Sequence, residues 1–143
     1  MKFHRTWFAD MDDEGTVFGY VPAINLFLTT GDEEQIRELF LIDVGAEVSM
    51  ASRRLCEVLG IPWEDGTPMI LKGISPLEEC QVMGRVHDVE IRIPELDHSL
   101  VIPICFAAGD APSLLGRRVF LDAFRIEFDQ PFRTTTFEYL LEP

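Results

Sequence analysis

The sequence has 143 residues, a formal net charge of −13, 47% hydrophobic residues and 10% aromatic residues. This length fits one domain over residues 1–143, and the hydrophobic content is that of a folded protein rather than a disordered one. The negative charge and the lack of a basic stripe argue against nucleic acid as a partner, because phosphate binding needs such a stripe.

The first 15 residues are too acidic and too irregular for a signal peptide. No apolar run approaches the roughly 20 residues that a membrane-spanning helix needs, so we expect no membrane partner. Cys56, Cys80 and Cys105 are odd in number and widely spaced, which fits neither a disulfide framework nor a zinc site. We therefore expect reduced thiols and a cytoplasmic protein.

Two strands are predicted early in the chain, over residues 20–28 and 36–43, with a polar turn between them. Apolar residues follow one another without alternation from Phe40 to Ile42, so the second strand is expected to be buried on both faces. Helical spacing of leucine and valine then predicts a helix over residues 49–60. Ser49 or Ser52 would cap its start and Gly60 would end it.

The second half of the chain predicts consecutive strands over residues 68–107, with regular alternation from Val86 to Ile93. Residues 73–79 would form the tip of a long hairpin. Residues 113–124 interrupt this pattern with a short helix, and residues 124–140 predict a hairpin that turns at Asp129, Gln130 and Pro131. The sum is an all-β protein, mainly β with two short helices, built as a barrel.

Asp43 is the feature that bears on function. A single aspartate at a strand end is usually a turn or cap residue. Here the carboxylate follows the apolar run LFLI, so it lies at the edge of a dry region. Gly45 lets the backbone come close to a ligand or another chain. The segment SLLGR, residues 113–117, is again apolar-apolar-Gly and would cross behind the first strand.

One carboxylate is insufficient for amide hydrolysis, because the attacking water needs a base and the leaving group needs an acid. Two aspartates that share one proton supply both, since like charges about 3 Å apart cannot both ionise. This chain carries one such motif. A homodimer with two-fold symmetry would place Asp43 beside Asp43 of a second copy.

The motifs LFLIDVGAEVSM and LLGRRVFLDAF together resemble the retroviral-type, or retropepsin-like, aspartic proteases. That family carries an apolar-apolar-D-T/S-G-A motif, a flap hairpin, and then an apolar-apolar-G-R motif. The resemblance implies a retropepsin-like acid protease barrel with one lobe per chain, a homodimer, and an aspartic endopeptidase that binds an extended peptide or protein substrate and needs no cofactor.

Carried over by position, Asp43 matches the catalytic aspartate, and Gly116 matches the glycine of the second motif. Glu47 and Arg117 match an acid and an arginine that brace the loop in the family, so we expect an ion pair between them; the alternative is two exposed charges that never meet. The predicted site comprises the catalytic Asp43, the active-site loop residues Val44, Gly45, Ala46 and Glu47, the second-motif residues Leu115, Gly116 and Arg117, and the flap residues Gly73, Ile74 and Ser75.

Val44 departs from the family pattern, which has Thr or Ser at this position. In the family that hydroxyl bonds to the partner's backbone, and valine can neither donate nor accept. The chain is then an active protease with other dimer contacts, a non-catalytic dimeric binding module on the same scaffold, or a chain altered at Val44. A third class, a small β-barrel ligand binder unrelated to proteases, also stays open.

Other chemistries find little support in the sequence. His4, His87 and His98 share no metal-ligand spacing with one another or with a cysteine, so we expect no metal site. Ser49 and Ser113 lack the G-x-S-x-G context of a serine hydrolase. Cys56 is expected to pack in a helix rather than act as a nucleophile.

Overall fold

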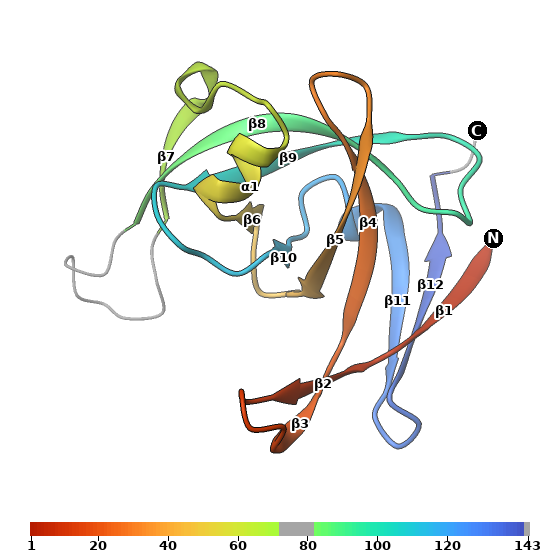
Figure 1. The fold of residues 1–143 in the computed structure, drawn as a ribbon. Helices are drawn as coiled ribbons and strands as arrows, with labels where there is room; N and C mark the ends of the chain where they lie inside the picture. The colour runs from red at the N-terminus through yellow and green to blue at the C-terminus, as the bar shows by residue number, and fades with distance from the viewer. Residues whose placement is uncertain (72–81, 142–143) are drawn as a thin grey trace.

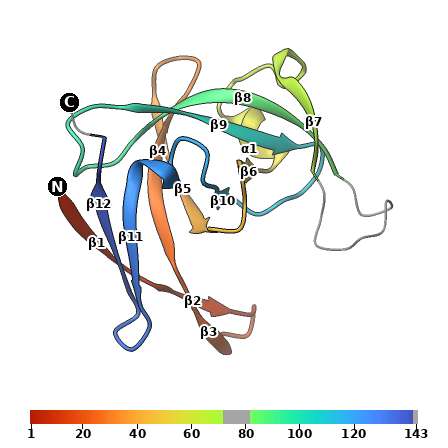
Figure 2. The same ribbon diagram turned by 180° about the vertical axis from the view of Figure 1, so that it is seen from behind.

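The computed structural model describes residues 1–71 and 82–141. Its main feature is a seven-stranded sheet in the order β4-β5-β10-β6-β9-β8-β7. An additional pairing of β4 with β8 closes the first six of these strands into a barrel (Figures 1 and 2). These strands are β4 (Ala23–Thr29), β5 (Gln35–Ile42), β6 (Ser49–Ala51), β7 (Thr67–Leu71), β8 (Val82–Arg92), β9 (Leu100–Ala107) and β10 (Leu114–Leu115).

A second sheet has three strands in the order β1-β12-β11. It combines β1 (Lys2–Thr6) from the start of the chain with the hairpin of β11 (Phe124–Asp129) and β12 (Thr134–Tyr139). Asp129 pairs with Thr134 at the end of this hairpin, which confirms the predicted turn. A separate two-stranded sheet is made of β2 (Phe8–Met11) and β3 (Val17–Val21).

The hydrophobic core fills the barrel and continues beneath the three-stranded sheet. Buried and exposed residues alternate from Asp88 in β8 to Ile93 just after it, which confirms the later part of the alternation predicted from Val86 to Ile93. Phe3 and Phe137 stack with ring centroids 4.9 Å apart, and Phe124 packs edge-on against both. These three rings belong to the three-stranded sheet, and they lie in one core cluster with side chains of the barrel, so β1 and β12 are anchored to the barrel through the shared core.

The helix predicted over residues 49–60 is only partly confirmed. Residues 49–51 form strand β6, which pairs with β9 in parallel and with β10 in antiparallel orientation. Because two neighbouring strands satisfy this backbone, tertiary pairing overrides the helical spacing. The helix α1 is Arg53–Val58, and the Ser52 hydroxyl caps it by accepting from the Leu55 amide. Gly60, with φ 70°, follows its end.

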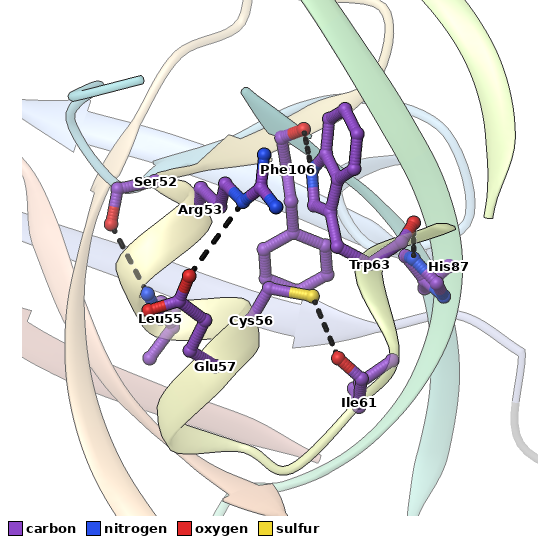
Figure 3. Close-up of polar contacts among 9 residues, drawn as sticks. All are labelled: Ser52, Arg53, Leu55, Cys56, Glu57, Ile61, Trp63, His87 and Phe106. Atoms are coloured by element: carbon purple, nitrogen blue, oxygen red, sulfur yellow. Dashed lines mark hydrogen bonds and ion pairs between the residues drawn. The ribbon is translucent and has the colours of Figure 1, made fainter. Parts of the chain in front are cut away.

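The corner around α1 contains a second short helix that the sequence did not predict, the 3-10 turn η1 (Trp63–Asp65). Figure 3 shows the Trp63 indole donating to the Phe106 carbonyl, while the Trp63 carbonyl contacts the His87 ring. The guanidinium of Arg53 lies 4.4 Å from the Trp63 ring centroid. These contacts fix α1 against β8 and β9. The short helix predicted near the second motif is the 3-10 turn η3 (Leu121–Ala123).

Two further predictions are settled by burial. Phe40 is fully buried, but Leu41 and Ile42 are half-buried, because β5 emerges from the barrel before the exposed loop that follows it; the prediction of burial on both faces is therefore wrong for these two. Cys56 is packed in the core, as predicted. Burial raises the pKa of the Cys56 thiol, so it is a poor nucleophile at neutral pH.

Candidate active site

Asp43 begins a tight turn directly after the C-terminal end of β5. Its amide donates to the Leu115 carbonyl at 3.0 Å, and its own carbonyl accepts from the Ala46 amide at 3.1 Å. One carboxylate oxygen of Asp43 accepts from the Gly45 amide at 3.0 Å. The turn therefore orients the carboxylate with its own backbone. Val44 and Gly45 are exposed, Val44 by 54%, so the tip of the turn faces outward.

The second motif lies directly beside this turn. β10 runs parallel to β5, with Leu115 opposite Ile42. Beyond β10, the Arg117 amide donates to the Ala46 carbonyl at 2.9 Å and the Arg118 amide donates to the Glu47 carbonyl at 2.8 Å. Two segments that lie far apart in the sequence thus hold each other through their backbones, and the Asp43 turn is braced from behind.

Gly116 is the point of closest approach between the two segments. A Cβ atom at this position would lie 2.5 Å from the Val48 carbonyl carbon and 2.9 Å from the Ser49 nitrogen. Both are backbone atoms, so they cannot move aside as the end of a side chain can. Only glycine fits here, which gives a steric reason for the glycine of the second motif.

The predicted ion pair between Glu47 and Arg117 is wrong. Glu47 pairs instead with Arg118, at 2.6 Å between carboxylate and guanidinium. The register explains the difference, since Arg118 has its backbone opposite Glu47 whereas Arg117 lies opposite Ala46. Both partners are about half exposed, so the pair adds little to stability and the backbone hydrogen bonds fix the loop.

Solved structures of known proteins resemble this chain in fold. A crystal structure of a retropepsin-like aspartic protease from Rickettsia conorii matches 97% of this chain and 94% of its own, with a TM-score of 0.60 and 17% sequence identity. The chain has the retropepsin-like fold. EIAV protease complexed with an inhibitor matches 71% of this chain and 86% of its own, with a TM-score of 0.49 and 18% identity. No family model and no curated protein matches the sequence.

Ser49 is a site residue that sequence reasoning missed. Its hydroxyl accepts a 3.0 Å hydrogen bond from the Gly116 amide, and both residues are buried. In this retropepsin-like chain the serine therefore ties the segment after Asp43 to the second motif. The sequence offered Ser49 as a helix cap and argued against a serine hydrolase role, but nothing local signals a partner 67 positions away.

Replacing Ser49 by alanine is expected to lower the free energy of unfolding by about 1–3 kcal/mol, because the buried Gly116 amide would lose its acceptor. Urea denaturation of the full chain measures this. Ser99→Ala is the matched control, since the Ser99 hydroxyl makes an exposed bond to Glu90, and it should stay within about 0.5 kcal/mol of the parent. Equal stability of the two variants would contradict the bracing role of Ser49.

The flap residues predicted from the sequence, Gly73, Ile74 and Ser75, lie outside the described residues. They fall between β7 and β8, which pair in antiparallel orientation up to Leu71 opposite Val82. Within residues 1–71 and 82–141, no group of three or more His, Cys, Asp or Glu side chains could hold a metal ion. In the same part of the chain, no helix is long and apolar enough to cross a membrane.

Proposed function

We propose that this chain is an aspartic endopeptidase that acts as a homodimer, with one Asp43 from each copy. The observation that carries this proposal is the Asp43 turn itself. It presents an oriented carboxylate at an exposed tip and is braced by the second motif. Each chain supplies one such turn, so a second copy is needed for a pair of carboxylates.

The pair would divide the chemistry between a carboxylate and a carboxylic acid. The ionised Asp43 takes a proton from water while the water oxygen adds to the peptide carbonyl carbon. The protonated Asp43 donates a hydrogen bond to the carbonyl oxygen as negative charge develops there. The carbon–nitrogen bond then breaks, and a proton passes to the amine. The two carboxylates share one proton because like charges held this close cannot both ionise.

The substrate class follows from the β architecture around the turn. An extended peptide adds to exposed strand edges through main-chain hydrogen bonds, and its side chains enter alternating pockets. We propose an extended peptide or protein substrate that crosses above the two Asp43 turns. The predicted flap residues would close over it.

Val44 supports a second candidate function, a non-catalytic dimeric binding module on the same fold. The side chain is 54% exposed at the tip of the turn, where the family carries a hydroxyl. Each missing hydrogen bond would cost about 0.5–1.5 kcal/mol, and symmetry doubles the loss. A dimer weakened in this way would hold its carboxylates less well, and catalysis is sensitive to small misplacements.

A peptide-library assay from acidic to neutral pH separates the two candidates. We expect the parent chain to cleave peptides. At chain concentrations below the dimer dissociation constant, Val44→Thr should cleave them about 5- to 100-fold faster, because the threonine hydroxyl strengthens the dimer. Cleavage by Val44→Thr alone would mean that the parent dimer is too weak. Absence of cleavage by both, in chains shown to be dimeric, would overturn the protease in favour of the binding module.

A further inference from the structure

Strands β2 and β3 form a ribbon that pairs with neither of the larger sheets. Figures 1 and 2 show it extending away from the barrel, below the end of β5. An isolated two-stranded ribbon is marginally stable in water unless something packs on it. Because the ribbon has only two strands and extends away from the barrel, we expect another surface to pack on it.

The side chains of the ribbon are those of an interface rather than of a solvated hairpin. Phe18 is 70% exposed and Met11 is 56% exposed. Met11 lies opposite Val17, and Phe18, the next residue of β3, points to the other face, so large apolar side chains are exposed on both faces of the ribbon. Exposed apolar residues gathered on one short element are typical of a binding surface. The exposed large apolar residues of the ribbon are Phe8, Met11, Val17, Phe18 and Tyr20.

The ribbon starts next to the candidate active site. β3 ends at Val21, and the following carbonyl, of Pro22, accepts from the Ile42 amide at 3.0 Å, one residue before Asp43. β4 then runs antiparallel to β5, with Ala23 opposite Leu41, so β3 continues past the end of β5. Five residues of strand span about 17 Å. The ribbon thus reaches beyond the Asp43 turn, into space that a partner approaching this turn would enter.

The base of the ribbon is fixed before any partner binds. The Arg133 guanidinium lies 3.6 Å from the Tyr20 ring centroid, and the Arg133 carbonyl accepts from the Trp7 amide at 2.8 Å. The Trp7 indole donates to the Thr135 hydroxyl. These contacts attach the ribbon to the β11–β12 hairpin. A preoriented arm loses less conformational entropy when it binds.

We propose that the β2–β3 ribbon is a dimerisation arm that packs on the second copy of the chain. The inference rests on the proposed function, because Asp43 needs a second copy at the place that the ribbon overhangs. Val44 cannot supply the hydrogen bond that would join the two turns, so apolar contact by the ribbon provides the association that the turn lacks. Both copies carry a net charge of −13, and added salt should therefore strengthen the dimer by screening their repulsion.

The test is sedimentation of the full chain with the double substitution Met11→Ser and Phe18→Ser. We expect the dimer dissociation constant to rise about 100-fold or more, because two exposed apolar anchors are lost on each copy. Val58→Ser with Val101→Ser is the matched control, since both valines are 56% exposed and lie outside the ribbon. This control should dimerise as the parent does. Thermal unfolding of each variant, diluted until it is monomeric, verifies that the fold is kept.

The outcomes separate this inference from the proposed function. An unchanged dissociation constant in the ribbon variant, or a parent that sediments as a monomer at every concentration, would overturn the dimerisation arm and leave the ribbon to another occupant. A dimer that weakens with salt would also contradict it. If the parent dimerises through the ribbon but cleaves no peptide, the proposed function fails and the arm stands. Hydrogen exchange gives a second measurement, with ribbon amides protected only in the dimer.

Discussion

Asp43→Asn is expected to abolish peptide cleavage, with a loss of about 10⁴-fold or more. The substitution removes both the general base and the general acid, because each member of the pair comes from the same position. Asparagine keeps an oxygen that can accept from the Gly45 amide, so the turn should retain its shape. Steady-state cleavage of a library-derived peptide measures the loss, and the sedimentation profile should stay that of the parent.

Mixing experiments make this prediction specific to a shared site. At constant total chain concentration, an equal mixture of parent and Asp43→Asn should retain about one quarter of the activity, because only dimers of two parent chains carry both carboxylates. Asp88→Asn makes the same chemical change at an exposed position of β8 and should leave cleavage intact. Activity that falls only in proportion to the diluted parent would indicate that each chain acts alone.

The parts of the fold that the sequence predicted are those where a local pattern and the tertiary structure agree. Asp43 follows a continuous apolar run, and the structure places it after β5, at the point where that strand leaves the core. The second apolar-apolar-Gly segment does lie beside it, because Leu115 pairs with Ile42, the residue before Asp43. A short buried strand that ends in a polar turn has few other places to lie in a closed barrel.

Two of the failures arise from backbone pairing between segments that are distant in the sequence. The helical spacing after Ser49 is real, but the first three residues extend because β9 and β10 offer hydrogen-bond partners on both sides. Likewise, the exchange of Arg117 for Arg118 as the partner of Glu47 is a shift of one residue. Such a shift alters which side chains meet without altering the pattern that the sequence displays.

The remaining features depend on contacts between distant segments. The buried bond between Ser49 and Gly116 joins residues that carry no local signal of pairing. The β2–β3 ribbon was not predicted at all, since the first strand expected from the sequence begins at residue 20, and no local pattern shows that Val17 and Phe18 stay exposed after folding. Apolar residues of a core and of an interface look alike in the sequence. They can be told apart only by their exposure in the folded chain.

Gly116→Ala is expected to have the second largest effect, on both stability and activity. The added Cβ would lie 2.5 Å from the Val48 carbonyl carbon, so the two segments must separate. Overpacking of this kind costs about 1–3 kcal/mol. A displacement of about 1 Å in the Asp43 turn would lower cleavage about 100-fold. Urea denaturation and steady-state cleavage measure the two effects on one preparation.

Gly109→Ala is the matched control, because a Cβ at Gly109 would meet nothing within 4 Å. It should be neutral or stabilise the chain by about 0.4–1 kcal/mol through a less flexible unfolded state. The comparison distinguishes the general effect of replacing a glycine by alanine from the steric clash that a Cβ atom at position 116 would cause. If Gly116→Ala unfolds and cleaves as Gly109→Ala does, the two segments are not held in the close contact that the geometry indicates. If stability falls but cleavage per folded dimer is unchanged, Gly116 serves folding and does not position Asp43.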